Sequence, residues 1–182
     1  QQAFLDELQS ARAGPDLMQT KLEDLKTVIH AKLTPKPKSN GNRRADHGPA
    51  RVYLICDKQD YEETQSLEDY LHNQNLEVIP PVEGDAKYHN ENLLLCDALL
   101  IYYNRAADPW AQIKRQELIK LPGLGRPKPI LAKAFYIGGE KTPQKERFRS
   151  HEARVIKHFG DFMPELLAPF LTDIQQAKGL PA

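Results

Sequence analysis

Hydrophobic positions after residue 51 fall into short uninterrupted runs that are separated by stretches of helical periodicity. Four of these runs predict strands: Val52–Cys56, Leu76–Ile79, Ala98–Tyr103 and Ile130–Ile137. The runs are apolar at nearly every position instead of every second one, which is typical of strands that are buried on both faces. We therefore expect a parallel sheet with a layer of helices on each side.

The segments between these runs carry helix signals. Asp60 and Glu63 are spaced as a capping box, and Thr142-Pro143 supplies a cap followed by a proline in the first turn. We expect helices from Asp60, over residues 87–96, from Pro109 to about Leu121, from Pro143, and from Pro164 to about Gln176. Because crossovers between parallel strands are right-handed, the pattern predicts a doubly wound, mainly parallel α/β domain of the flavodoxin-like type.

Upstream of this domain, residues 16–33 have the spacing of one amphipathic helix. Its apolar positions are Leu22, Leu25, Ile29 and Leu33. A single helix cannot bury that stripe alone, so we expect it to pack on the main domain, to belong to an upstream domain, or to pair in a coiled coil. The chain begins at Gln1 instead of methionine, so we also expect it to be a fragment of a longer protein.

The next segment, residues 34–50, holds three prolines, two glycines and no large apolar side chain. That composition is typical of a solvated linker. The sequence therefore predicts an appended helical segment at 1–33, a flexible linker at 34–50 and an α/β domain at 51–182.

Composition excludes several classes of protein. Hydrophobic residues make up 40% of the 182 residues, enough for a core, but no apolar run approaches the roughly 20 residues that span a bilayer. Cys56 and Cys96 lie inside apolar runs, which argues against a disulfide framework or a zinc site. No secretory signal is recognisable, so we expect a cytoplasmic protein without a membrane partner.

Charge is balanced over the chain and unbalanced along it. The 25 basic and 25 acidic side chains give a net charge of zero, so we expect no nucleic-acid partner. Residues 57–97, however, carry eleven acidic and two basic side chains, and residues 110–157 carry twelve basic and four acidic ones. If the fold keeps these blocks apart it has two unlike surfaces, and if winding interleaves them the charges cancel.

The carboxyl ends of the predicted strands, where wound α/β folds bind ligands, lack the motifs of several enzyme classes. The first strand is followed by CDKQD, without the glycines that a dinucleotide or P-loop phosphate site requires. Asn104 stands where a phosphoacceptor receiver domain needs an aspartate, and no Gly-x-Ser-x-Gly elbow is present. The histidines show no metal-ligand spacing, and His89 has the position of a helix-surface residue. We expect no metal and no resident cofactor.

Five segments, taken in order, resemble a Toll/interleukin-1 receptor (TIR) domain of divergent bacterial type. They are RVYLICDKQD, EVIPP with the loop VEGDA, NLLLCDALLIYYN, DPWAQIKRQEL and RPKPILAKAFYI. The resemblance runs from Arg51 to about Gln176. It implies signal transduction in a multidomain bacterial protein, as in bacterial defence, through self-association or through binding another TIR-like domain.

The same resemblance implies a second activity, because many bacterial TIR domains hydrolyse NAD. In the family a glutamate four residues after the tryptophan of the fourth segment acts on the ribose attached to nicotinamide. Here Lys114 holds that position, and Glu117 follows Trp110 by seven residues, on the same helix face but about 5 Å further along. Glu117 is the candidate catalytic residue. The alternative is a solvated glutamate that pairs with Lys114, Lys120 or Lys133.

Four further residues are candidates for ligand binding. Asp57 and Lys58 follow the first strand, where its loop meets a ligand, and the resemblance places Trp110 beside the pocket. Tyr102 and Tyr103 point in alternating directions, so one packs inward while the other borders the crevice, and Tyr103 is our candidate.

These observations leave three functions open. The first is a signalling and assembly module, favoured by the linker, the charge blocks and the displaced glutamate. The alternative is an NAD glycohydrolase that takes NAD as substrate, releases nicotinamide and ADP-ribose or a cyclised product, and uses Glu117. The third is a sensor that binds a nucleotide without chemistry.

Overall fold

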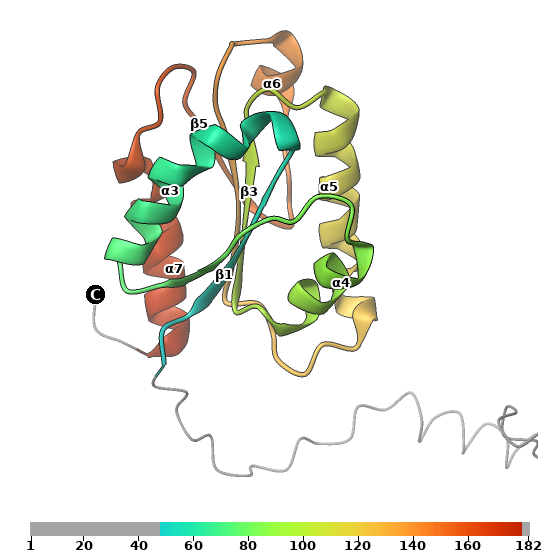
Figure 1. The fold of residues 1–182 in the computed structure, drawn as a ribbon, viewed down its shortest axis with the longest axis vertical. Coiled ribbons are helices and arrows are strands. Elements are labelled where there is room, and N and C mark those ends of the chain that lie inside the picture. Colours follow the sequence, from blue (N-terminus) through green and yellow to red (C-terminus); the bar gives the residue numbers. More distant parts are fainter. Residues whose placement is uncertain (1–47, 180–182) are drawn as a thin grey trace, which may run out of the picture. The chain divides into compact units, whose positions relative to one another are not determined.

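The computed structural model describes residues 48–179 (Figure 1). The predicted helix at 16–33 and almost all of the predicted linker lie outside the described residues.

Five strands form one sheet in the order β2-β1-β3-β4-β5, and every neighbouring pair is parallel. The strands are β1 (Arg51–Cys56), β2 (Glu77–Ile79), β3 (Ala98–Tyr103), β4 (Ala132–Ile137) and β5 (Arg154–Lys157). This topology confirms the predicted doubly wound α/β fold of the flavodoxin-like type.

Helices cover both faces of the sheet (Figure 1). They are α3 (Tyr61–Asn73), α4 (Ala86–Leu95), α5 (Asp108–Lys120), α6 (Pro143–Arg147) and α7 (Ala168–Lys178), with 3-10 turns η1 (Lys58–Asp60), η2 (Leu121–Leu124) and η3 (Pro164–Leu167). Leu67 of α3 and Phe170 of α7 belong to the core on one face. Leu93 of α4 and Leu118 of α5 belong to the core on the other face. The apolar strands are thus buried on both sides, as their composition predicts.

The hydrophobic pattern predicts four strands and misses β5. This strand has four residues, pairs only with β4, and buries Ile156 while Arg154 stays exposed. A short edge strand with charged ends has no uninterrupted apolar run, and therefore lacks the signal that identifies the other strands.

The capping box predicted at Asp60 does not form. Asp60 precedes α3, but its carboxylate makes no bond to that helix. It is fully buried and accepts the backbone N–H groups of Asn104 (3.2 Å) and Arg105 (2.8 Å). Burial raises the pKa of this carboxyl, and the two backbone hydrogen bonds oppose that rise. Asp60 therefore joins the start of α3 to the loop that leaves β3.

A second buried charge joins the loops after β3 and β4. The ammonium group of Lys145, on α6, donates to the backbone carbonyls of Gly138 (2.9 Å), Glu140 (3.2 Å) and Asn104. Its side chain is 5% exposed, and burial lowers its pKa. Thr142 caps α6 by accepting the backbone N–H of Lys145 (3.2 Å), as the Thr142-Pro143 pattern predicts.

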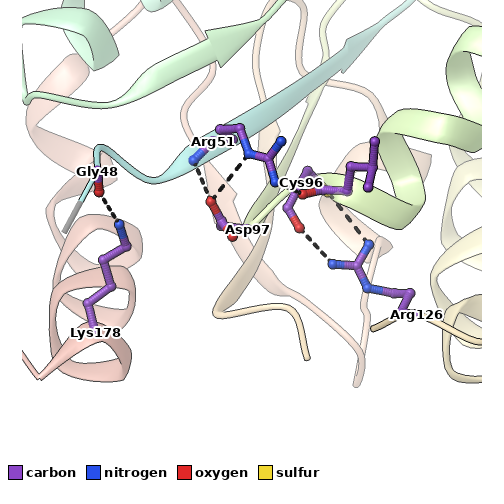
Figure 2. Close-up of polar contacts among 7 residues, drawn as sticks. Gly48, Arg51, Cys96, Asp97, Arg126 and Lys178 are labelled. Atoms are coloured by element: carbon purple, nitrogen blue, oxygen red, sulfur yellow. Dashed lines mark hydrogen bonds and ion pairs between the residues drawn. The ribbon is translucent and has the colours of Figure 1, made fainter. Parts of the chain in front are cut away.

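At the opposite end of the sheet, polar contacts fix the first described residues (Figure 2). Lys178 at the end of α7 donates to the carbonyl of Gly48 (2.6 Å). The backbone N–H of Arg51 donates to Asp97 (2.9 Å), and the guanidinium of Arg51 lies 3.8 Å from the same carboxylate. These contacts hold β1 in place between α7 and the start of β3.

Candidate functional site

A cavity of about 400 Å³ opens at the carboxyl ends of β1 and β2, with α4 and α5 contributing to its wall. Its lining comes from β1 and the loop after it, the first residue of α3, the loop after β2, and one turn each of α4 and α5. The lining residues are Tyr53, Ile55, Cys56, Asp57, Lys58, Tyr61, Pro81, Val82, Glu83, Gly84, Asp85, Ala86, His89, Trp110 and Lys114.

Three of the five candidate residues from the sequence line this cavity. They are Asp57, Lys58 and Trp110. Tyr103 and Glu117 are absent from the lining. The structure thus brings the strand-end residues and the tryptophan together, and sets the candidate catalytic carboxylate behind the wall.

At the mouth of the cavity, charged side chains already have partners. Asp57 caps η1 by accepting the backbone N–H of Gln59 (3.1 Å). Lys58 lies 3.4 Å from Glu83, which belongs to the loop after β2. Both members of this pair are about two-thirds exposed, so the contact contributes little to stability.

Glu117 belongs to a chain of polar contacts that runs from the cavity into the protein. The Tyr53 hydroxyl lies 2.9 Å from Nδ1 of His89, and Nε2 of His89 lies 3.2 Å from Glu117. The Lys114 ammonium lies 3.0 Å from both oxygens of Glu117. Tyr53, His89 and Lys114 border the cavity, so Glu117 contacts the groups of its wall instead of the space within it.

The surroundings of Glu117 and Tyr53, the two ends of this series of contacts, determine their protonation. Burial on its own would raise the pKa of Glu117, but the hydrogen bonds from His89 and Lys114 lower it below its usual value. Burial raises the pKa of Tyr53, and Tyr88 and Glu117 raise it further. At neutral pH this series of contacts therefore has an ionised carboxylate, that of Glu117, at one end and a neutral phenol, that of Tyr53, at the other.

Lys114 decides what this wall can do chemically. It occupies the position at which the TIR resemblance expects a glutamate, and its side chain is 16% exposed at the cavity wall. Cleavage of an N-glycosidic bond builds positive charge on the ribose, which a carboxylate stabilises and an ammonium group opposes. Of the three lysines expected as partners of Glu117, Lys114 is the one that pairs with it.

Tyr103 lies in the core under this site. Its ring is 1% exposed and lies 6.4 Å from the ring of Trp110 and 6.1 Å from that of Phe148. Its hydroxyl donates to Asp108 at the start of α5. Tyr103 thus supports the helix that carries Trp110 and Lys114. Tyr102 is also buried, on the opposite face of the sheet, so neither tyrosine of the pair borders this cavity.

Tyr53, His89 and Lys114 are absent from the sequence-based candidates. Tyr53 stands within an apolar strand, and His89 has the position of a helix-surface residue. In the structure the His89 side chain is 21% exposed and makes two polar contacts. The one signal for it is its place in the first turns of α4, just after the loop that leaves β2.

A second cavity, of about 510 Å³, opens at the same end of the sheet on the α3 face. It is lined by Glu63, Ser66, Tyr102, Asn104, Arg105, Gly139, Glu140, Gly160, Asp161 and Phe162. Arg105 forms an ion pair with Glu63, and the amide of Asn104 donates to the same carboxylate. The Oδ1 atom of Asn104 is buried without a hydrogen-bond partner.

The sheet order determines where the two charge blocks lie. Residues 57–97, the acidic block, include α3, β2 and α4, which lie on the β2 side of the sheet. Residues 110–157, the basic block, include most of α5 and all of β4, α6 and β5, which lie on the β5 side. β3 separates the two and carries no charged residue. The order therefore segregates the blocks instead of interleaving them.

No family model matches the chain, and no curated protein matches it. Within residues 48–179, no cluster of histidine, cysteine and carboxylate side chains is arranged to hold a metal ion, and both cysteines are free and buried. The helices described here are all too short or too polar to cross a bilayer.

Proposed function

We propose that this protein is a TIR-like signalling and assembly domain that acts in the cytoplasm and associates head to tail. Its acidic β2 side contacts the basic β5 side of a second copy or of another TIR-like domain. Two unlike patches on one molecule make a heterologous contact, which produces open filaments or scaffolds unless the rotation between copies closes a ring.

The observation that carries this proposal is the sheet order β2-β1-β3-β4-β5. Because the order follows the chain except at its first two strands, consecutive elements stay on one side of the sheet. A net charge of −9 over residues 57–97 and of +8 over residues 110–157 is thereby distributed between opposite sides.

Unpaired charges on both sides support it further. Glu62, Asp69 and Glu77 on the acidic side are exposed and form no ion pair with another described residue. Lys120 and Arg147 on the basic side are exposed and equally without a carboxylate partner among residues 48–179. Complementary potentials of this kind accelerate encounter and fix the register of a complex.

Sedimentation velocity of the full chain at two ionic strengths tests the proposal. We expect concentration-dependent association at about 0.05 M salt that is lost at about 0.5 M, where screening shortens the Debye length from about 14 Å to about 4 Å. A chain that stays monomeric at high concentration and low salt contradicts the proposal.

The second candidate function is NAD hydrolysis in the cavity between α4 and α5. Trp110 on the cavity wall favours it, since an aromatic face suits a nucleotide ring. The pairing of Glu117 with Lys114 and His89 ranks it below assembly, because the carboxylate is held away from the cavity.

Nicotinamide release from NAD by the full chain, compared with that by Glu117→Ala, tests this second function. Turnover that falls at least about 100-fold in the variant supports Glu117 as the catalytic carboxylate. Turnover that is unchanged in the variant removes Glu117 from the reaction. No turnover by the wild-type chain, tested also under conditions in which it associates, removes the enzyme.

A further inference from the structure

Three cations gather on the basic side around the segment that links α6 to β5. We call Arg115 of α5, Arg149 of the loop and Lys157 of β5 the basic socket. Arg115 donates to the carbonyl of Arg149 (3.1 Å), and Arg149 donates to that of Glu146 (2.8 Å). Lys157 donates to the same carbonyl of Glu146 (2.6 Å). Three positive side chains from three elements therefore meet on one short stretch of backbone.

Among residues 48–179, the basic socket has no carboxylate counterion. None of its three cations forms an ion pair with a carboxylate among residues 48–179. The carboxylate of Glu146, whose backbone carbonyl accepts from Arg149 and Lys157, pairs instead with Lys141 at 2.9 Å. Cations without a carboxylate partner fit an anionic oxygen supplied by another molecule.

The titration of Lys157 points the same way. Burial lowers the pKa of its ammonium group, and the positive charge of Arg149 lowers it further, against a smaller opposing effect of Glu146. A neighbouring cation disfavours the charged form of an amine. An anion bound at this point would relieve the repulsion.

We propose that the basic socket binds carboxylates from α3 of a second copy, namely those of Glu62 and Asp69. This inference rests on the proposed head-to-tail assembly and names the residues that make the contact.

Glu62 and Asp69 are suited to the basic socket. They stand seven residues apart on α3, so they lie on one face of the helix and about 10 Å apart along its axis. Both are exposed. Their helix packs on one face of the sheet, whereas α5, which carries Arg115, packs on the opposite face. The α3 carboxylates of one copy therefore cannot bind the basic socket of the same copy. When two copies bind each other, one basic socket and one α3 remain unoccupied at the ends of the pair.

Single charge removal in the full chain tests the proposal by sedimentation velocity at low salt. We expect Arg149→Gln to weaken association about 10-fold or more, and the matched variant Lys120→Gln to weaken it less than about 3-fold. Lys120 is exposed on the same side, has no carboxylate partner among the described residues, and lies outside the basic socket. Equal effects of the two variants would overturn the basic socket while leaving the assembly proposal standing. Absence of association in the wild-type chain would overturn both.

Exchanging the charges at positions 149 and 69 distinguishes the loss of a contact from the loss of the fold. Arg149→Glu is expected to abolish association, and addition of Asp69→Arg in the same chain is expected to restore it to within about 10-fold of wild type. Failure of the double variant to recover, with far-ultraviolet circular dichroism unchanged, would overturn the pairing with α3. Binding of inorganic phosphate to the basic socket without loss of association would overturn a carboxylate as its occupant.

Discussion

The cavity between α4 and α5 and the basic socket are both lined by ionisable side chains, yet they differ in how the charges are balanced. In the cavity wall Lys114 is neutralised by Glu117, and at its mouth Lys58 faces Glu83. In the basic socket Arg149 and Lys157 donate to backbone carbonyls, and no described carboxylate pairs with them.

This difference separates a completed site from an incomplete one. The ion pairs of the cavity are satisfied within one copy, so the cavity needs no outside charge to be stable. The basic socket retains its positive charge, since a carbonyl accepts a hydrogen bond but does not cancel a full charge. The contrast supports the proposed association over the proposed catalysis.

Removal of the Lys145 ammonium group is expected to cause the greatest loss of stability, because it affects both regions at once. Lys145 joins the loop after β3, which leads into α5 and the cavity, to the loop after β4, which leads toward the basic socket. Lys145→Met leaves the buried carbonyls of Asn104 and Gly138, and the partly buried one of Glu140, without their donor, so we expect the free energy of unfolding to fall by about 3 kcal/mol. Urea denaturation measures this, with the exposed Lys141→Met as the control. A loss below about 1 kcal/mol would show that Lys145 does not hold the two loops together.

Sequence reasoning predicts the fold where burial leaves a simple pattern. β1, β3 and β4 are apolar because both faces are covered, and Thr142-Pro143 identifies α6 by local chemistry alone. The hydrophobic pattern does not predict β5, because an edge strand needs no apolar run. Asp60 is misread because its partners, the backbone N–H groups after β3, are more than 40 residues away in the chain.

The sequence predicts the residues of the candidate sites only in part, as it does the fold. Asp57, Lys58 and Trp110 are found because strand ends and helix starts converge at one edge of a parallel sheet. The contacts from His89 to Tyr53 and Glu117 span 36 and 28 residues, and no local pattern encodes them. The charge blocks are visible in the sequence, but their separation depends on the strand order.

A smaller loss of stability is expected when the charge of Glu117 is removed from the cavity wall. Glu117→Gln removes the charge that binds Lys114 and His89, and we expect it to lower the free energy of unfolding by about 1–2 kcal/mol at pH 7. The pKa of Glu117 is lowered in the folded state, so its contribution is present above the usual carboxyl pKa and is lost as pH falls through the folded-state value.

Chemical denaturation of wild type and Glu117→Gln between about pH 3 and 7 measures this dependence. The two curves should converge at the acidic end, and association of the variant should equal that of wild type. A difference that stays constant with pH would contradict an ionised Glu117 as its source.

The smallest effect concerns a compensated pair on the basic side. Arg154 of β5 and Asp173 of α7 form two-pronged contacts of 2.9–3.1 Å, but both side chains are more than a third exposed. Asp173→Asn should change the free energy of unfolding by less than about 0.5 kcal/mol in thermal denaturation. A loss above about 1 kcal/mol would mean that paired surface charges here stabilise the fold more than solvent screening allows.

Mixing two variants of this chain, each with one surface altered, is the most direct test of assembly between the acidic and basic sides. Glu62→Gln with Asp69→Gln removes the acidic contact and keeps the basic socket, and Arg149→Gln with Lys157→Gln does the reverse. By sedimentation velocity at low salt, each variant alone should be monomeric, and the equimolar mixture should form a one-to-one dimer that grows no further. Self-association of either variant alone, or a mixture that stays monomeric while wild type associates, would contradict assembly between the acidic and basic sides.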